Sequence, residues 1–335
     1  MDKQNNNNQI TLPRRSRRLA TIIPASHWID MGYSEDDAQL MEKLQNDMKN
    51  YCDSSDTDIN LHGRNGVGAL NHHELMIPHW NKLLKALKGR TNVEFGITSV
   101  SLSTSLLDVV FPALQLVNIV ELTLFGCGLG DEGFQCLSFF LGNNSSVKSL
   151  GVGADQIDNW LVARALSGAI KDHPSLEEIF VANCVGHNTR NLSTILLGCT
   201  TKKRLIITME YFSAYGPQGI DVLANFICSN HSFESLQLKD NDITNDDAKL
   251  LAVALKHNAL LKELDVREND DITEEGEKAL LKAMFDSTSM DSIVNSNHVC
   301  KDMHKTNMST VEKGRGGRLV VELYKICSNS LYLWD

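Results

Sequence analysis

Three stretches of the chain share one pattern. Residues 119–129 read IVELTLFGCGL, residues 233–243 read FESLQLKDNDI, and residues 261–272 read LKELDVRENDDI. Each begins with three apolar residues in the spacing h-x-x-h-x-h, and a small polar residue follows three positions after the last of them. The alternation at the end of the trio is typical of a short strand with one buried face. The pattern therefore predicts a strand that leads into a tight bend.

The same trio recurs along most of the chain. Further copies begin at Ile97, Val147 and Leu176, with a degraded copy at 205–207 and a truncated one at 290–293. The starts from Ile119 onward lie 28, 29, 57, 28 and 29 residues apart, and the interval of 57 spans two units. Self-similarity at a fixed period of this length predicts a solenoid.

Helical periodicity follows each strand pattern. In residues 244–257, Thr244 suits a helix N-cap, and Ala248, Leu251 and Leu255 lie on one helical face. A strand plus a helix in every unit predicts an α/β horseshoe of about seven repeats, with parallel strands on the concave face and helices on the convex face.

The small polar residue after each trio has a structural task. It lies where the chain turns away from the strand, and a short polar side chain there can hydrogen-bond to buried backbone groups of the bend. The residues at this position are Cys127, Asp155, Cys184, Asn241 and Asn269.

The stretches LTLFGCGL, LQLKDNDI and LDVRENDDI fit the motif L-x-x-L-x-L-x-x-N/C-x-L. This motif, with a full helix in each unit, resembles the ribonuclease-inhibitor class of leucine-rich repeats over roughly 200 residues. The stretches IPHWNKLLKAL and VNSNHVC are similar to an uncharacterised set of algal (diatom-type) leucine-rich-repeat proteins. That second resemblance implies no activity. Near Leu205 the register stays open, because Glu210 stands where Asn or Cys belongs.

The pattern divides the chain into four segments. Residues 1–26 read as a disordered, basic and Asn-rich tail, and residues 27–91 as a helical cap for the open end of the array. In the cap we expect one helix after Ser34, a loop at 53–68 and a second helix at 79–87. The repeat array covers 92–300, and residues 301–335 read as a linker plus a C-terminal helix.

Charge is distributed unevenly along the chain. The net charge is −10, and residues 231–291 hold 15 acidic and 7 basic residues, a local charge of −8. An acidic body disfavours nucleic-acid binding and favours a basic protein or peptide. The tail, by contrast, holds five basic residues and one acidic residue in 1–20, a local charge of +4. Its cluster Arg14, Arg15, Arg17 and Arg18 is either a nuclear-import signal or a solvated tail.

Composition suggests a compartment. The scattered cysteines lack CxxC pairs, which favours reduced thiols in the cytoplasm or nucleus. No apolar run approaches the ~18 residues of a membrane span.

The residues that could bind a metal or a cofactor, or act as nucleophiles, all fit a structural role more simply. His72, His73, Glu74 and His79 lack a metal-binding spacing, so we expect no metal. The glycine trio at 126, 128 and 130 lacks a dinucleotide fingerprint and fits a tight turn, so we expect no cofactor. Cys127 and Cys184 read as buried structural thiols, and a single Gly-Arg-Gly-Gly box at Arg315 reads as a linker.

The concave sheet surface is the expected binding site. Residues between the core positions should face outward in two columns. The central column is Thr123, Gly151, Phe180, Ile206, Gln237 and Asp265, and the next column is Phe125, Gly153, Ala182, Thr208, Lys239 and Arg267. With Asp240, Asp265, Glu268 and Asp270 as an acidic rim, the partner-binding candidates are Thr123, Phe125, Phe180, Ile206, Gln237, Lys239, Asp240, Asp265, Arg267 and Glu268. The alternative is that insertions or the cap cover the apolar members.

We therefore expect a non-catalytic scaffold that binds a protein or peptide on its concave face, in an oligomeric state that the sequence does not reveal. One alternative is a regulator of a small GTPase, since Ran GTPase-activating proteins use this repeat class. Those proteins carry a long acidic tail, whereas residues 301–318 here are basic. The other alternative is the sensor fragment of an immune-type receptor, although no GxxxxGK[ST] loop is present.

Overall fold

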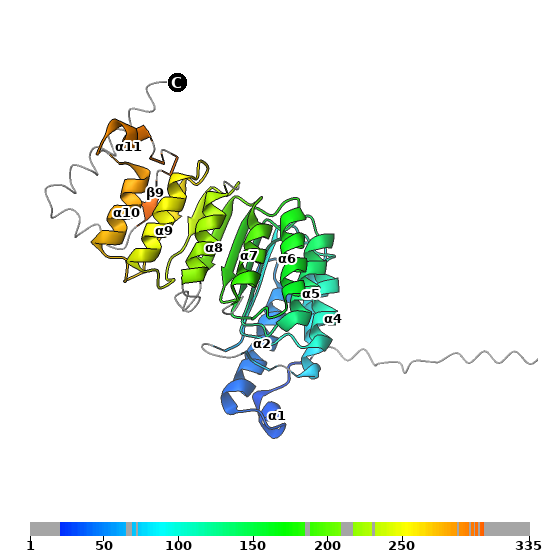
Figure 1. Cartoon of the computed structure of the whole chain (residues 1–335). Coiled ribbons are helices and arrows are strands. Elements are labelled where there is room, and N and C mark those ends of the chain that lie inside the picture. Colours follow the sequence, from blue (N-terminus) through cyan, green and yellow to red (C-terminus); the bar gives the residue numbers. More distant parts are fainter. Residues whose placement is uncertain are drawn as a thin grey trace, which may run out of the picture.

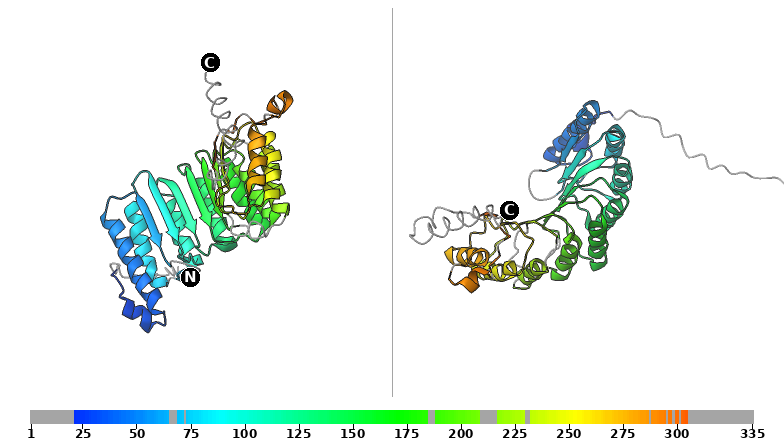
Figure 2. Two further views of the ribbon diagram at one scale, coloured as in Figure 1. Left: turned by 90° about the vertical axis from the view of Figure 1, so that its left-hand side faces the viewer. Right: turned by 90° about the horizontal axis from the view of Figure 1, so that it is seen from above.

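The computed structural model describes residues 21–64, 69–71, 73–184, 188–208, 217–229, 232–286, 288–294, 296–297, 299–300 and 302–304 (Figure 1). Within these residues, helices and strands alternate along the chain and form an open arc. Seen from above in Figure 2, the helices follow the outer side of the arc and the strands follow the inner side. This is the α/β horseshoe that the repeat period predicts.

The strands of the described residues form one parallel sheet in which spatial order equals chain order. They are β1 (Asp58–His62), β2 (Val93–Thr98), β3 (Ile119–Phe125), β4 (Ser149–Gly153), β5 (Glu178–Ala182), β6 (Arg204–Thr208), β7 (Ser235–Gln237), β8 (Glu263–Asp265) and β9 (Asp302–His304). Each strand pairs only with its predecessor and its successor. The sheet therefore grows by one strand for each coil.

Helices cover the outer side of the sheet. They are α1 (Ala25–Asp30), α2 (Glu35–Asp53), the short 3-10 helix η1 (Glu74–Met76), α3 (Ile77–Leu87), α4 (Thr104–Leu114), α5 (Gly130–Asn143), α6 (Trp160–Asp172), α7 (Thr189–Cys199), α8 (Pro217–Cys228), α9 (Asn245–Lys256), α10 (Glu274–Met284) and α11 (Met290–Val294). From α3 to α10, successive helices contact one another as successive strands do. Each coil thus packs on its neighbours through both layers.

Local sequence fixes where the helices begin. Ser34 accepts a hydrogen bond from the Asp37 backbone N–H at the start of α2, as its sequence predicts. Thr244 and Asp247 form a reciprocal capping box at the start of α9. Both helices then present an apolar face to the sheet, so the predicted N-caps and inner faces are confirmed.

The core is a series of apolar rows that run across the strands. One row joins Leu122, Leu150, Ile179, Leu205, Leu236 and Leu264 in direct register. All six side chains are at most 1% exposed. The register also resolves the degraded unit, because Leu205 and Ile207 pair with Ile179 and Val181.

A second set of polar side chains closes the turns from helix to strand. Asn144, His173, Asn258 and Asn297 each accept hydrogen bonds from two backbone N–H groups that follow them in the chain. Sequence analysis does not find these positions, because they follow the helices and lie outside the motif. Polar side chains of the repeats therefore satisfy backbone groups in the turns at both ends of the strands.

Two parts of the predicted repeat register are wrong. The first copy was placed at Ile97, Val100 and Leu102, but β2 spans Val93–Thr98, and Phe95 and Ile97 pair with Leu122 and Leu124. The segment predicted as a loop at 53–68 contains β1, whose Ile59 and Leu61 continue the buried rows. Short apolar alternation in a segment rich in Asp and Ser was masked by its turn-like composition.

The last copy is also wrong. Residues 290–293 lie in helix α11 with Met290 exposed, and the next strand is β9, paired to β8. Of the tail predicted at 1–26, residues 1–20 lie outside the described residues, and helix α1 begins within the remainder, at Ala25. Glu210 and the predicted C-terminal helix also lie outside the described residues.

Candidate functional site: the concave face

Outward-facing residues form straight rows across the inner face of the sheet. The register places Thr123, Gly151, Phe180, Ile206, Gln237 and Asp265 in one row, the predicted central column. A second row joins Phe125, Gly153, Ala182 and Thr208, and Lys239 and Arg267 lie two residues beyond their partners in the central row. Each row therefore contributes one residue per coil to the inner face of the sheet.

Two aromatic rings form a platform on this face. Phe125 and Phe180 are stacked, with ring centroids 5.2 Å apart and an interplanar angle of 22°. Both are half-buried. The intervening strand β4 carries glycines, and a Cβ at Gly153 would clash with the Phe125 ring. The rings therefore occupy the space that side chains on β4 would fill. We call this pair the aromatic platform.

Two acidic residues of the C-terminal rim have basic partners. The Lys239 ammonium lies 2.9 Å from the Glu268 carboxylate, and the Arg267 guanidinium lies 2.6 Å from the Asp265 carboxylate. Asp265 is 1% exposed. The expectation of an open Asp265 carboxylate is therefore wrong, because this carboxylate is buried against the Arg267 guanidinium. The charges of Glu268 and Asp265 are thus compensated within the chain.

Asp240 and Glu268 also have a backbone role. They lie directly after the strand pattern, where the chain adopts a left-handed bend. Positive φ values near 55° recur at this position of the repeat, at Ser99, Gly126, Ala154, Asn183, Asp240 and Glu268. Gly126, Gly128 and Gly130 all have positive φ, which fits the tight-turn reading of the glycine trio.

Inward polar side chains satisfy the bends, as the sequence predicts. The Asp155 carboxylate accepts hydrogen bonds from the backbone N–H groups of Cys127 at 2.9 Å and Gly128 at 2.6 Å. The Asn269 side-chain oxygen accepts from the N–H groups of Asn241 and Ile243 at 2.9 Å, and its amide donates to backbone carbonyls. Each side chain thus closes the bend of the preceding coil.

Burial makes the cysteines at these positions poor nucleophiles. Burial raises the pKa of the Cys184 thiol to about 12 and also raises that of Cys127, and the Asp155 carboxylate raises both further. Neither thiol ionises readily at neutral pH, so a thiolate mechanism gains no support here. Both side chains occupy the inward position of the bend that follows each strand.

The histidine segment has structural contacts. His73 Nδ1 accepts from the Leu75 N–H, and His79 is buried with its pKa lowered by desolvation. Across the described residues, no group of three His, Cys, Asp or Glu side chains is arranged to hold a metal ion. His72 and Arg315 lie outside the described residues.

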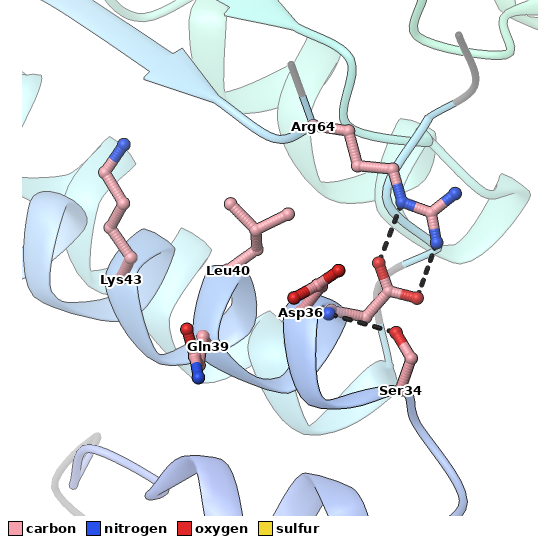
Figure 3. Close-up of a pocket in the computed structure, with 7 residues that line it drawn as sticks. Ser34, Asp36, Gln39, Leu40, Lys43 and Arg64 are labelled. Carbon is pink, nitrogen blue, oxygen red and sulfur yellow. Dashed lines mark hydrogen bonds and ion pairs between the residues drawn. The ribbon is translucent and has the colours of Figure 1, made fainter. Parts of the chain in front are cut away.

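A surface hollow of about 690 Å³ lies on the cap, away from the concave face (Figure 3). It is lined by the first turns of α2 and by Arg64. The Arg64 guanidinium donates two hydrogen bonds to the Asp37 carboxylate, at 2.8 and 2.6 Å, and this contact lowers the pKa of Asp37. The dashed lines in Figure 3 show this ion pair and the hydrogen bond that the Asp37 backbone N–H donates to Ser34.

Sequence reasoning missed an acidic row at the N-terminal end of the inner face. Asp58, Glu94 and Glu121 lie in direct register on β1, β2 and β3, and all three are exposed. We call these residues the acidic row. Apolar alternation at Ile59–Leu61 and Phe95–Ile97 was the signal that would have revealed it. The sequence pattern omits β1 and places β2 at the wrong residues, so it does not align Asp58, Glu94 and Glu121 at one position of the repeat.

Comparison with known proteins supports the repeat architecture. The family model described as "Leucine Rich repeat" matches residues 115–138, 229–252 and 257–281. No curated protein matches the chain. Among solved structures, the chain is similar to one described as "Crystal structure of Rad7 and Elc1 complex in yeast", at 15% identity and a TM-score of 0.32. That match covers 61% of this chain and 62% of the other, which is less than two thirds of the matched chain.

Together, the matched repeats and the parallel sheet with its outer helices show a leucine-rich-repeat horseshoe. Across the described residues, none of the helices combines the length and the apolar character that crossing a bilayer requires.

Proposed function

We propose that this chain is a non-catalytic interaction scaffold of the ribonuclease-inhibitor repeat type that binds a protein or peptide on its concave face. The aromatic platform carries this proposal. Half-buried rings beside polar groups, on a concave surface, are the usual composition of a protein-binding hot spot. Thr123, Ile206 and Gln237 extend the surface along the central row.

The remaining candidates form the edge of the same surface. Lys239, Asp240, Asp265, Arg267 and Glu268 frame the C-terminal end of the inner face. Paired charges at an interface rim contribute more to orientation than to affinity. We assign the exposed members Lys239, Asp240, Arg267 and Glu268 to positioning of the partner and the platform to affinity, while the buried Asp265 holds Arg267 in place.

Affinity capture from a native extract tests the proposal. The intact chain should retain partners that a Phe180→Ala variant loses. Phe139→Ala is the matched control, because Phe139 on the convex helix α5 is 71% exposed. Identical sets of captured proteins for the intact chain and both variants would contradict a concave binding site.

We further propose a cytoplasmic or nuclear location, with the basic tail as the import signal. The support is the cluster Arg14, Arg15, Arg17 and Arg18. A fluorescent fusion of the full chain should lose nuclear signal when these arginines are replaced by serine. Unchanged distribution would leave the tail without a targeting role.

A further inference from the structure

The acidic row concentrates negative charge at one end of the inner face. Neighbouring strands of a sheet lie about 4.8 Å apart, so Asp58, Glu94 and Glu121 follow one another over roughly 10 Å. Among the described residues, no lysine or arginine forms an ion pair with any of the three. The Asp58 carboxylate accepts a hydrogen bond from the Asn60 side chain within the same strand.

Like charges in register oppose each other. Partial burial raises the pKa of Glu121, and the carboxylates of Glu94, Glu178 and Asp58 raise it further. Like charges directly across a sheet are destabilising. The fold thus carries an unfavourable arrangement at this end of the sheet, and a cationic ligand would relieve it.

Further along the same row, basic residues accompany the acidic ones. After Ser149 come Glu178 and Arg204, which form an ion pair of 3.5 Å, and Ser235 donates to Glu263 at 2.7 Å. The flanking pairs Glu177–Lys203 and Glu234–Lys262 lie at 3.0 and 2.9 Å. Within the described residues, three successive acidic residues in register occur on β1–β3, and a shorter acidic pair, Glu263 and Asp302, is in register on β8 and β9.

The aromatic platform borders this charge. Phe125 lies four residues beyond Glu121 on the same strand and the same face, with Thr123 between them. Arginine side chains stack on aromatic faces and form ion pairs with carboxylates, so both surfaces suit one kind of side chain.

Resting on the function proposed above, we infer that the inner face of β1–β5 binds an extended arginine-rich segment of a partner protein, which lies across the strands. Basic side chains pair with Asp58, Glu94 and Glu121, and an arginine or an aromatic side chain packs on the platform of Phe125 and Phe180. Same-side residues of an extended peptide repeat about every 6.6 Å, so two or three of them match the acidic row. The negative charge of the acidic row favours a segment rich in arginine as the ligand of this face.

Fluorescence anisotropy with two synthetic peptides tests the inference on the full chain. One probe alternates arginine and serine and ends in phenylalanine, and the other has glutamate in place of arginine. The arginine probe should bind with an affinity that falls as salt rises, and the glutamate probe should not bind. Equal binding of both probes would overturn the inference.

Two matched charge variants locate the contact. Glu94→Gln with Glu121→Gln should weaken the arginine probe about tenfold. Asp108→Asn with Asp172→Asn removes two exposed charges from the convex helices α4 and α6 and should change affinity less than about twofold. Equal losses in the two double variants would mean general attraction to an acidic protein and would overturn the site.

The tail of the same chain is the competing occupant. In a variant with Arg14, Arg15, Arg17 and Arg18 replaced by serine, the arginine probe should bind within about threefold of the intact chain. If the probe binds only after this replacement, and the Glu94→Gln, Glu121→Gln changes then abolish it, the tail occupies the row and a partner segment is ruled out.

These results are separable from the test of the proposed function. Partners lost with Phe180→Ala but retained with Glu94→Gln and Glu121→Gln would leave a concave scaffold whose partner is not arginine-rich. In that outcome the inference fails and the proposed function stands.

Discussion

The inner wall carries its charges differently at its two ends. On β1–β3, Asp58, Glu94 and Glu121 are exposed and in register, with no basic partner among the described residues. From β5 to β8, several acidic side chains have basic partners, as in Glu234–Lys262 and Asp265–Arg267. The more acidic stretch of sequence, 231–291, thus holds ion pairs on its inner surface that the acidic row does not have. Register, rather than local composition, decides where open charge lies.

The same contrast appears in the bends. In the N-terminal half the charged Asp155 closes a bend as an acceptor, whereas Asn269 in the C-terminal half both accepts and donates. The two ends therefore share a backbone design and differ in the charge of the groups that complete it. Substitutions in matched positions can separate the shared part from the differing part.

The largest effect should be the same at both ends. Leu122→Ala and Leu236→Ala each remove a fully buried side chain from one continuous row, so each should lower the free energy of unfolding by about 2–5 kcal/mol. Urea denaturation of both variants measures this. A loss at one end alone would break the comparison, because it would show that the cores differ as well as the charges.

A smaller effect should follow from the bends at both ends. Asn269→Asp loses the side-chain amide that donates to the Leu238 and Val266 carbonyls, at a cost of about 1–3 kcal/mol. Asp155→Asn replaces one of the two oxygens that accept from Cys127 and Gly128 by an amide nitrogen, which leaves one backbone N–H without its acceptor at a similar cost of about 1–3 kcal/mol. Thermal unfolding of both variants measures this, and an unchanged melting temperature in either would contradict the assigned role.

Asp155 also gives the N-terminal half a pH dependence. Burial raises the pKa of its carboxyl, so the folded chain binds this proton more tightly than the unfolded chain does. The stabilisation is complete below the unfolded pKa and is lost as pH rises through the folded pKa. Asp155→Asn should flatten the plot of unfolding free energy against pH between the unfolded and folded pKa values of Asp155. An unchanged slope would contradict this role of Asp155.

Phe180→Ala should have a moderate effect on stability. It removes the stacking partner of Phe125 on a half-buried surface, at a cost of about 0.5–1.5 kcal/mol beyond the area lost. The chain should stay folded by far-ultraviolet circular dichroism. Complete unfolding would mean that the platform belongs to the core and is not a surface for a partner.

The smallest effects should have opposite signs. Glu121→Gln removes repulsion within the acidic row and should raise the free energy of unfolding at neutral pH by about 0.2–1 kcal/mol. Glu234→Gln removes an ion pair with Lys262 and should lower it by about 0.2–1 kcal/mol. Because the pKa of Glu121 is raised in the fold, its effect should disappear in acid, below the unfolded pKa. Equal signs would remove the contrast.

Periodicity predicted the architecture well. The spacing of Leu122, Leu124 and the equivalent residues predicted the strands, and Thr244 predicted a helix start. Both signals are local in sequence, because the alternation lies within one strand and an N-cap lies within one turn of its helix. The acidic row was missed, since it required the register of β1 and β2, which only the short apolar alternations at Ile59–Leu61 and Phe95–Ile97 indicate in the sequence. The neutralisation of Asp265 could not be predicted either, because it depends on how the Arg267 side chain folds back within the bend.

Spatial order that follows chain order has a consequence for how such a molecule can change over time. Because each coil touches only the coils on either side, a duplicated unit of 28 or 29 residues would insert without rethreading the rest of the chain. Every insertion would add one strand to the inner face. The length of a bound segment would then increase with the number of repeats, while the outward-facing residues of each strand remained free to diverge.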